Sequence, residues 1–324
     1  MILSRRAIIG GLPAAGIVAT ARAADWRPDR PMTWIVPFPP GGSNDIFARP
    51  VAAQVGQSLG QPVVIDNRGG AGGTLGGMIA ARAAPDGCTL LVGNTGLTFA
   101  QVVYDEGGFD LVRDFAPVSL LARVPVALVV NPSTVPATDL VSFLALAKAS
   151  PGRLTVGSSG LGTIPHLAIE LLQQRAGVRF THVPYRGGGQ ALQDVTSGTV
   201  DALMTPLSTV VSYVQSGRLR ALAVASVSRQ QILPNVPSFA EAGLADFRVG
   251  TWYGLFAPKA TPALVLDALN VAVQAALGSA EVARVWADQG AQLIPESRLA
   301  FTAFVTSETE RWSTLAKKIG IPKE

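Results

Sequence analysis

The sequence predicts an α/β fold of two lobes, each a mainly parallel sheet flanked by helices. Short apolar runs alternate with segments of helical periodicity, which is typical of parallel sheets. Loops rich in glycine and hydroxyl residues follow several of these runs, and the design repeats in the second half of the chain. About 300 residues also usually divide into two domains. Because ligands of such sheets bind beyond the carboxyl ends of the strands, these loops are the candidate site.

Residues 1–23 are predicted to be an export signal. Arg5 and Arg6 precede a weakly apolar stretch at 7–20, and small residues end it at Ala23, where cleavage is expected. The arginine pair also resembles a twin-arginine signal. A single N-terminal membrane anchor is the alternative, but the stretch is short and glycine-rich for a bilayer span.

The composition excludes several classes of protein. Removing residues 1–23 from the 324 takes away three arginines and no acid, so 301 residues remain and the net charge falls from +4 to +1. This small charge gives no support to nucleic-acid binding. Cys88 is the only cysteine, so no intrachain disulfide forms, and with His166 and His182 it cannot make a His/Cys zinc site. We therefore expect no metal, no cofactor, no nucleic acid and no stable membrane insertion of the mature chain.

The first lobe is expected to begin with three strands, each followed by a glycine-bearing loop. The strands are predicted at 33–36, 62–65 and 89–92, and the helices at 46–59 and about 75–84. Ser43 is predicted to cap the first helix. Pro50 should kink that helix or restrict its first turn.

The second lobe repeats this order. The apolar runs 117–121 and 126–130, separated by residues 122–125, predict a strand that leaves the first lobe and enters the second, followed by a helix at 140–149 capped by Thr138 or Asp139. Further strands are predicted at 154–156, 181–183, 200–204 and 220–225, with helices that end near 175, follow 190 and span 210–216.

The chain is then expected to return to the first lobe. A strand at 251–258 and two helices, 262–277 and 298–319, complete it, the last helix with Ser297 as its cap. The predicted domains are residues 26–124 together with 227–324 for the first lobe, and 125–226 for the second.

The first glycine loop has the features of an anion site. Gly41 and Gly42 let the backbone approach a ligand closely, and the helix that follows presents free N–H groups and the positive end of its dipole. The alternative is an ordinary connection between strand and helix. Asp45 would repel an anion unless it points elsewhere, so it is interpreted as a capping residue or as the partner of a ligand ammonium group.

Two loops of the second lobe have similar chemistry. One carries Ser158, Ser159, Gly160, Thr163 and His166, whose hydroxyl and N–H groups can bind a carboxylate without a buried ion pair. The other loop combines Tyr185 with three glycines, Gly187, Gly188 and Gly189. A packed core residue is the equal alternative for His166.

Catalytic and cofactor motifs are weak. An exported serine hydrolase using Ser159, with His166 as its base, is the enzymatic alternative, but no third orienting group and no G-x-S-x-G spacing accompany the pair. The glycine run at 70–73 fails as a dinucleotide fingerprint because Leu75 stands where glycine is required. No P-loop sequence occurs.

Taken together, these loops resemble the tripartite tricarboxylate transporter substrate-binding family, also called Bug or TctC-type periplasmic receptors. The matching motifs are VPFPPGGSND at 36–45, VIDNRGGAGG at 64–73, PHL at 165–167, VPYRG at 183–187, GTVDA at 198–202 and WYGLFAP at 252–258. They occur in family order over nearly the whole mature chain. One departure, Gly188-Gly189-Gln190 in place of a proline-bearing continuation, is expected to reshape one wall of the pocket.

The resemblance implies a type II-like periplasmic binding fold that closes over a small carboxylate-bearing solute. It implies a receptor, not an enzyme, that delivers the solute to the membrane permease subunits of a tripartite transporter. A ligand sensor for a membrane kinase is the other possible role. The implied ligand-binding residues are Phe38, Pro40, Gly41, Gly42, Ser43, Asp45, Asn94, Thr95, Ser158, Ser159, Gly160, Thr163, His166, Tyr185, Gly187, Gly188, Gly189 and Thr205.

Overall fold

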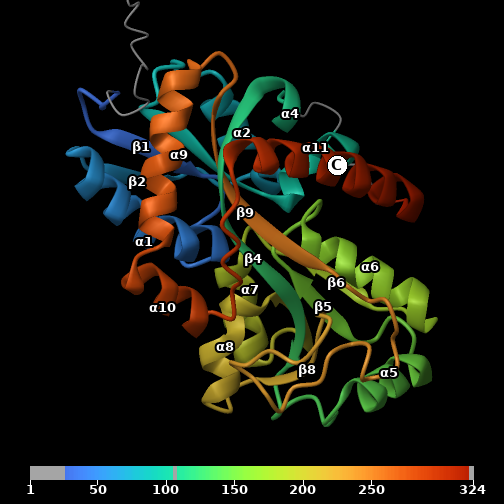
Figure 1. Ribbon diagram of the computed structural model, residues 1–324. Coiled ribbons are helices and arrows are strands. Elements are labelled where there is room, and N and C mark those ends of the chain that lie inside the picture. The colour runs from blue at the N-terminus through green and yellow to red at the C-terminus, as the bar shows by residue number, and fades with distance from the viewer. Residues whose placement is uncertain (1–25, 105–107, 321–324) are drawn as a thin grey trace, which may run out of the picture.

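The computed structural model describes residues 26–104 and 108–320, so the expected export signal at 1–23 lies outside the described residues. The chain forms two lobes connected by two long strands, β4 (Phe115–Val130) and β9 (Gly250–Pro258) (Figure 1). Each lobe has a sheet with helices packed against it, as the sequence predicts.

The sheet of the first lobe has the strand order β2-β1-β3-β9-β4. Strand β1 (Met32–Val36) pairs in parallel with β2 (Val63–Asn67) and β3 (Thr89–Asn94). Strand β9 is antiparallel to both of its neighbours, β3 and β4. All strands of this sheet except β9 therefore run in one direction, which confirms the mainly parallel prediction.

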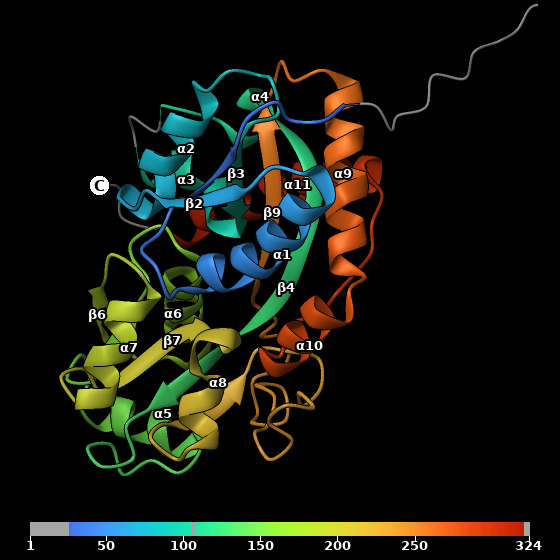
Figure 2. The ribbon, with the colours of Figure 1, turned by 90° about the vertical axis from the view of Figure 1, so that its left-hand side faces the viewer.

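The sheet of the second lobe is built in the same way around the other half of β4. Strands β7 (Ala202–Pro206) and β8 (Arg220–Val224) pair antiparallel with β4, and β5 (Thr155–Ser158) pairs in parallel with β7 and with β6 (Thr181–Pro184). Here β4 is the one strand that runs against the others. The carboxyl ends of β1, β3, β5 and β7 thus point toward the junction of the lobes (Figure 2).

The strand predicted to leave the first lobe and enter the second is β4, which runs unbroken over 16 residues. Pro125 lacks an N–H group, but it pairs with Gly250 at the first residue of β9, where the ladder between the two strands ends. The register shifts twice along this pairing, between Pro117 and Ser119 and between Leu120 and Ala122. The two sheets consequently share one unbroken backbone.

The helices cover the outer faces of both sheets. They are α1 (Ser43–Leu59), α2 (Thr74–Ala81), α3 (Ala100–Val103), α4 (Leu111–Asp114), α5 (Leu140–Ala149), α6 (Ile164–Ala176), α7 (Gly188–Ser197), α8 (Leu207–Gln215), α9 (Ala263–Leu277), α10 (Ala280–Asp288) and α11 (Arg298–Ile319). Helix α10 was not predicted. Asp139 caps α5 and Ser297 caps α11, as predicted.

The prediction that Ser43 caps α1 is wrong. Gly42 occupies the cap position and the helix begins at Ser43, whose hydroxyl bonds elsewhere. Pro50 lies in the interior of α1 and not in its first turn.

The segment after β8 packs on the second lobe before the chain returns. Ser238 forms a bridge with Val224 of β8, and Phe239 and Phe247 join the hydrophobic cluster that contains Phe143 of α5. Ser238, Phe239 and Phe247, which the predicted boundary assigns to the first lobe, therefore contact elements of the second lobe.

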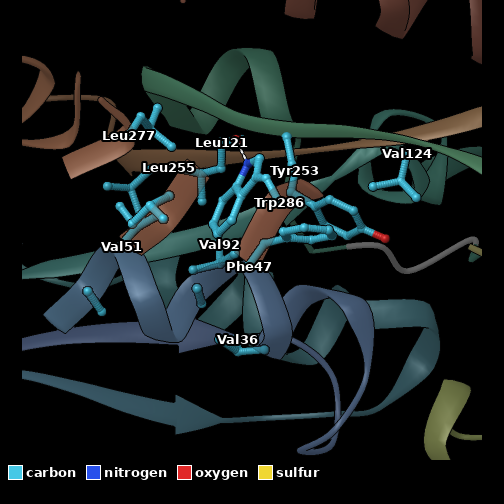
Figure 3. Packing of buried hydrophobic residues seen from close by; sticks show 14 of the residues in the cluster. Val36, Phe47, Val51, Val92, Leu121, Val124, Tyr253, Leu255, Leu277 and Trp286 are labelled. Carbon is cyan, nitrogen blue, oxygen red and sulfur yellow. Dashed lines mark hydrogen bonds between the residues drawn. The ribbon is translucent and has the colours of Figure 1, made fainter. Parts of the chain in front are cut away.

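Large aromatic side chains anchor α1 to the sheet of the first lobe (Figure 3). The ring of Phe47 lies 5.0 Å from the rings of both Tyr253 on β9 and Trp286 on α10. The indole N–H of Trp286 donates to the carbonyl of Leu121, 2.8 Å away, so its one polar atom is satisfied. This packing fixes the start of α1, where the first glycine loop meets the cleft.

Within residues 26–104 and 108–320, no single helix is long and apolar enough to cross a membrane. Only the pair α9 and α10, bent by 68°, would reach that length and composition together.

Candidate functional site

The glycine and hydroxyl loops of the two lobes meet around a cavity of about 40 Å³. Its walls come from the ends of β1, β3, β5 and β7 and from the helices that follow, with β9 at the back. The lining residues are Phe38, Gly42, Ser43, Asn44, Asn94, Gly96, Ser159, Thr163, Ile164, Pro165, Gly188, Pro206, Thr209, Thr251 and Tyr253.

The N-termini of four helices reach this cavity. Ser43 begins α1, Thr163 precedes α6, Gly188 begins α7, and Pro206 precedes α8. The first N–H groups of a helix have no partner within it, and the helix dipole places partial positive charge there. None of the lining residues carries a formal charge. The cavity can therefore receive an anion through neutral donors alone.

Ser43 bridges the two lobes at the wall of the cavity. Its hydroxyl lies 2.9 Å from the hydroxyls of both Ser208 and Thr209, in the first turn of α8. The phenol of Tyr253 also forms a hydrogen bond with Ser43, and burial raises the pKa of this phenol, so Tyr253 stays neutral. The lobes are thus in contact around the cavity.

A chain of amides fixes the wall on the first-lobe side. The Asn44 amide donates to the carbonyl of Val92 at 3.0 Å, and the Asn94 amide donates to the Asn44 side-chain oxygen at 2.9 Å. The oxygen of Asn94 accepts from the N–H of Gly96, also at 2.9 Å. Because each amide has assigned partners, its orientation toward the cavity is determined before a ligand binds.

The loop after β5 is held from behind by two stacked histidines. The rings of His166 and His182 lie 4.3 Å apart at an angle of 7°. Nε2 of His182 lies 2.7 Å from the hydroxyl of Ser158, and Nδ1 of His166 accepts from the N–H of Gly162 at 3.3 Å. Burial lowers the pKa of His166 to about 3 and that of His182 to about 4, so both rings are neutral.

These contacts change the interpretation of the serine and histidine residues. Ser159 lines the cavity, whereas the serine bonded to a histidine is its neighbour Ser158, which is fully buried and pairs with His182. The Ser159–His166 pair considered for a hydrolase is therefore not formed, because Nδ1 of His166 is used by the backbone and its Nε2 faces Glu170 at 3.8 Å.

Asp45 points away from the cavity. Its carboxylate accepts from the N–H of Gly41 at 3.1 Å, from the Asn67 amide at 3.1 Å, and from the Arg49 guanidinium in two bonds of 2.8 Å. Burial alone would raise the pKa of Asp45, but these hydrogen bonds outweigh it and hold the pKa below its ordinary value. They also secure Gly41, whose φ of +82° is a conformation that other residues rarely adopt.

Two buried threonines of the candidate set lie behind the lining. The Thr95 hydroxyl accepts from the backbone N–H of Trp252 at 2.8 Å. The Thr205 hydroxyl has no partner within the described residues, although Thr205 is fully buried. It lies beside Gly188, where a Cβ atom would be 4.0 Å from it. A buried hydroxyl without a partner is costly, so Thr205 is a candidate donor to a ligand.

A larger groove of about 850 Å³ continues outward from the cavity, with Phe38 and Ser159 in the walls of both. Tyr185 lines this groove, and its hydroxyl donates to Asp194 at 2.6 Å, so it faces α7. Burial raises the pKa of Tyr185, and the bond to Asp194 raises it further. On the facing side, Pro39 lies so close to Gly187 that a Cβ there would be 2.9 Å from the proline ring.

The structure thus separates the predicted site residues into three groups. Phe38, Gly42, Ser43, Asn94, Ser159, Thr163 and Gly188 line the inner cavity. Pro40, Gly160 and Tyr185 line only the outer groove. Gly41, Asp45, Thr95, Ser158, His166, Gly187, Gly189 and Thr205 line neither.

The sequence analysis missed several lining residues. Asn44 and Pro165 are adjacent to predicted positions, so proximity to those loops could have identified them, and Thr209 lies three residues after the end of β7. Thr251 and Tyr253 come from β9, far along the chain, and no local pattern marks them.

Residues 47–321 match the profile of a family described as the tripartite tricarboxylate transporter family receptor. The chain belongs to this family. BugT of Bordetella pertussis is 37% identical to this receptor over 97% of either chain.

Solved structures of relatives have the same fold as this receptor. The Rhodopseudomonas palustris protein Rpa4515, determined with adipate, is 35% identical, has a TM-score of 0.88, and covers 93% of this receptor and 100% of its own chain.

A second solved relative is MatC of R. palustris, determined with bound malate. It is 36% identical, has a TM-score of 0.84, and covers 89% of this receptor and 99% of its own chain. These matches place the receptor among the two-lobed periplasmic binding proteins, which confirms both the fold class and the family resemblance.

Proposed function

We propose that this receptor captures a small carboxylate between its lobes and delivers it to the permease subunits of a tripartite tricarboxylate-type transporter. The observation that supports this most directly is the meeting of four helix N-termini around a cavity without charged lining residues. Neutral N–H and hydroxyl donors hold an anion there, and the dipoles supply the attraction. The malate and adipate found with two relatives are anions of the same chemical class.

The dimensions suggest how the solute lies. The inner cavity of about 40 Å³ accommodates little more than a carboxylate group, and the groove of about 850 Å³ that adjoins it accommodates the rest of the molecule. Ser43, Ser159 and Thr209, which line the inner cavity, are the proposed hydroxyl donors to the carboxylate. Thr205, whose buried hydroxyl has no partner within the described residues, lies behind them. Asp45, His166 and His182 act from behind, by fixing the loops that carry those donors.

Calorimetry and thermal unfolding of residues 24–324 test this function. The panel contains malate, succinate, adipate, citrate and benzoate, and the neutral amide of each acid is tested as its control. One acid class should stabilise the protein, by about 2.7 kcal/mol at 100 times Kd, which is roughly 5–10 °C in Tm for a chain of this size. The amides should have no effect. Equal stabilisation by acids and amides, or none across the panel, would refute the proposal.

Export and the membrane partner have separate tests. We propose periplasmic export through a signal cleaved after Ala23, with Arg5 and Arg6 directing the twin-arginine route. Replacing both arginines with lysine should block export by that route, whereas unchanged export would assign the general secretory route. Affinity purification with the liganded mature chain should recover permease subunits, and recovery of a sensor kinase instead would assign a signalling role.

A further inference from the structure

A second cavity of about 470 Å³ lies at the crossing of β4 and β9, and we call it the hinge pocket. Its walls are residues 123–125 of β4, the segment 225–230 after β8, residues 248–252, Gln292 and one face of α11. Thr251 belongs both to these walls and to the wall of the inner cavity. The hinge pocket thus adjoins the strands that connect the lobes, and it shares Thr251 with the inner cavity.

Three aromatic residues, Trp252, Phe304 and Trp312, lie in the hinge pocket. The indole N–H groups of Trp252 and Trp312 both donate to one carboxylate oxygen of Glu308, at 3.2 and 2.6 Å. The other oxygen of Glu308 accepts from Arg311 at 3.0 Å. The rings are therefore fixed in orientation, and the charge of Glu308 is already neutralised.

The remaining charge of the hinge pocket is positive. Arg123 pairs with Glu296 at 2.8 Å, with its guanidinium 4.2 Å from the centre of the Phe304 ring. Arg311 pairs with Glu308. Within residues 26–104 and 108–320, the side chain of Arg248 has no hydrogen bond or ion pair, so its charge is uncompensated. The side chain of Val227, which is 72% exposed, belongs to the same pocket wall.

We propose that the hinge pocket binds a small planar aromatic carboxylate. Its volume is in the range of small-molecule sites. The Arg248 guanidinium can bind the carboxylate through two parallel hydrogen bonds. The parts of Trp252, Phe304 and Trp312 that line the pocket can contact the ring of the ligand. Covering Val227 would remove apolar surface from water.

Binding at the hinge pocket should be coupled to closure of the cleft. The pocket takes residues from the second-lobe segment 225–230 and from α11, so a change in the angle between the lobes changes its shape. A ligand that fits the closed arrangement stabilises it, and by linkage it raises affinity in the cleft by the same factor. This coupling rests on the proposed function, whereas the existence of the site does not.

The test is a titration of residues 24–324 with 1-naphthoate, followed by tryptophan fluorescence because Trp252 and Trp312 line the hinge pocket. Neutral 1-naphthamide is the control ligand. Saturable quenching by 1-naphthoate is expected, and Arg248→Gln should weaken it at least about tenfold, which corresponds to one strong ionic hydrogen bond. Arg153→Gln, an exposed arginine of the same lobe, should bind as the parent does.

Two further variants locate the site. Val227→Trp should narrow the hinge pocket and weaken 1-naphthoate, whereas Val141→Trp, at another exposed valine, should not. Gly188→Leu, which fills the inner cavity, should leave 1-naphthoate binding intact. The proposal is overturned if the parent shows no saturable binding, if Arg248→Gln binds as tightly as the parent, or if Gly188→Leu abolishes binding. In the last case the ligand occupies the cleft.

Discussion

The hydroxyl of Ser43, at the first residue of α1, lies 2.9 Å from the hydroxyl of Thr209, in the first turn of α8. The two helices belong to different lobes, so this contact exists only when the lobes are together. The same side chain also contacts Ser208. Ser43 therefore both lines the cavity and stabilises its closure.

Replacement of Ser43 with alanine should weaken ligand binding. The variant loses two hydrogen bonds between the lobes, each worth about 0.5–1.5 kcal/mol, so Kd should rise by roughly 5–150-fold. Calorimetry with the acid identified in the panel measures this. Ser58→Ala, at an exposed serine of the same helix, is the matched control and should bind normally. Parental affinity in Ser43→Ala would show that the contact does not contribute to closure.

Gly188→Leu should abolish binding in the cleft without unfolding the chain. A Cβ at Gly188 meets only ordinary contacts, the nearest being Thr209 at 3.7 Å, so the fold tolerates the side chain, and the remaining atoms must enter the cavity. The ligand-dependent rise in Tm should disappear while the ligand-free Tm changes little. Gly278→Leu, at the end of α9, should keep the ligand response. Retention of the response in Gly188→Leu would place the ligand elsewhere.

Asp45→Asn should destabilise the receptor in a pH-dependent way. The folded-state pKa of Asp45 lies below that of the unfolded chain, so its contribution is full above about pH 4 and is lost as the pH falls through the folded value. At pH 7 the variant should be less stable by about 1.5–3 kcal/mol, the value of hydrogen bonds to a charged group. Urea unfolding at several pH values measures the difference, with exposed Asp29→Asn as control. A difference in unfolding free energy between the two proteins that stays constant down to pH 2 would contradict this explanation.

The stacked histidines should make the receptor acid-sensitive. An unfolded histidine protonates near pH 6.5, but the folded values are about 3 for His166 and about 4 for His182. The unfolded chain then binds more protons, so stability is full above about pH 6.5 and falls toward acid by up to about 1.4 kcal/mol per pH unit for each ring. His182→Gln should reduce this slope between pH 6.5 and 5. If the unfolding free energy of the unmutated receptor does not change between pH 6.5 and 5, the two histidines are not held neutral in the folded protein.

Much of the fold could be predicted because its signals are local. An apolar run, a glycine turn and a capping residue lie within about twenty positions of each other, and Asp139 and Ser297 cap the helices that the pattern assigned to them. The strand that joins the lobes, β4, was also predicted. Arg123 and Pro125 lie between its two apolar runs, and pairing of both residues with β9 continues the strand through them.

The site was less predictable, because its walls join distant segments. The loop after β1 was identified, but the partners of Ser43 are 165 and 166 residues away, and no local pattern indicates them. Ser158 and Ser159 look equivalent in the sequence. In the structure, Ser158 faces the interior and contacts His182 on the neighbouring strand β6, whereas Ser159 faces the cavity.

The neutral wall of the cavity has a consequence for how solutes are discriminated. Among the lining residues in the part of the chain that the structure describes, Tyr253 is the only one with an ionisable side chain, and burial raises its pKa. Just above neutral pH, no lining side chain therefore changes its protonation state. The pH dependence of solute binding then comes from ionisation of the solute. Such a receptor would take an acid only in its deprotonated form, and it would keep the same selectivity as the medium turns alkaline.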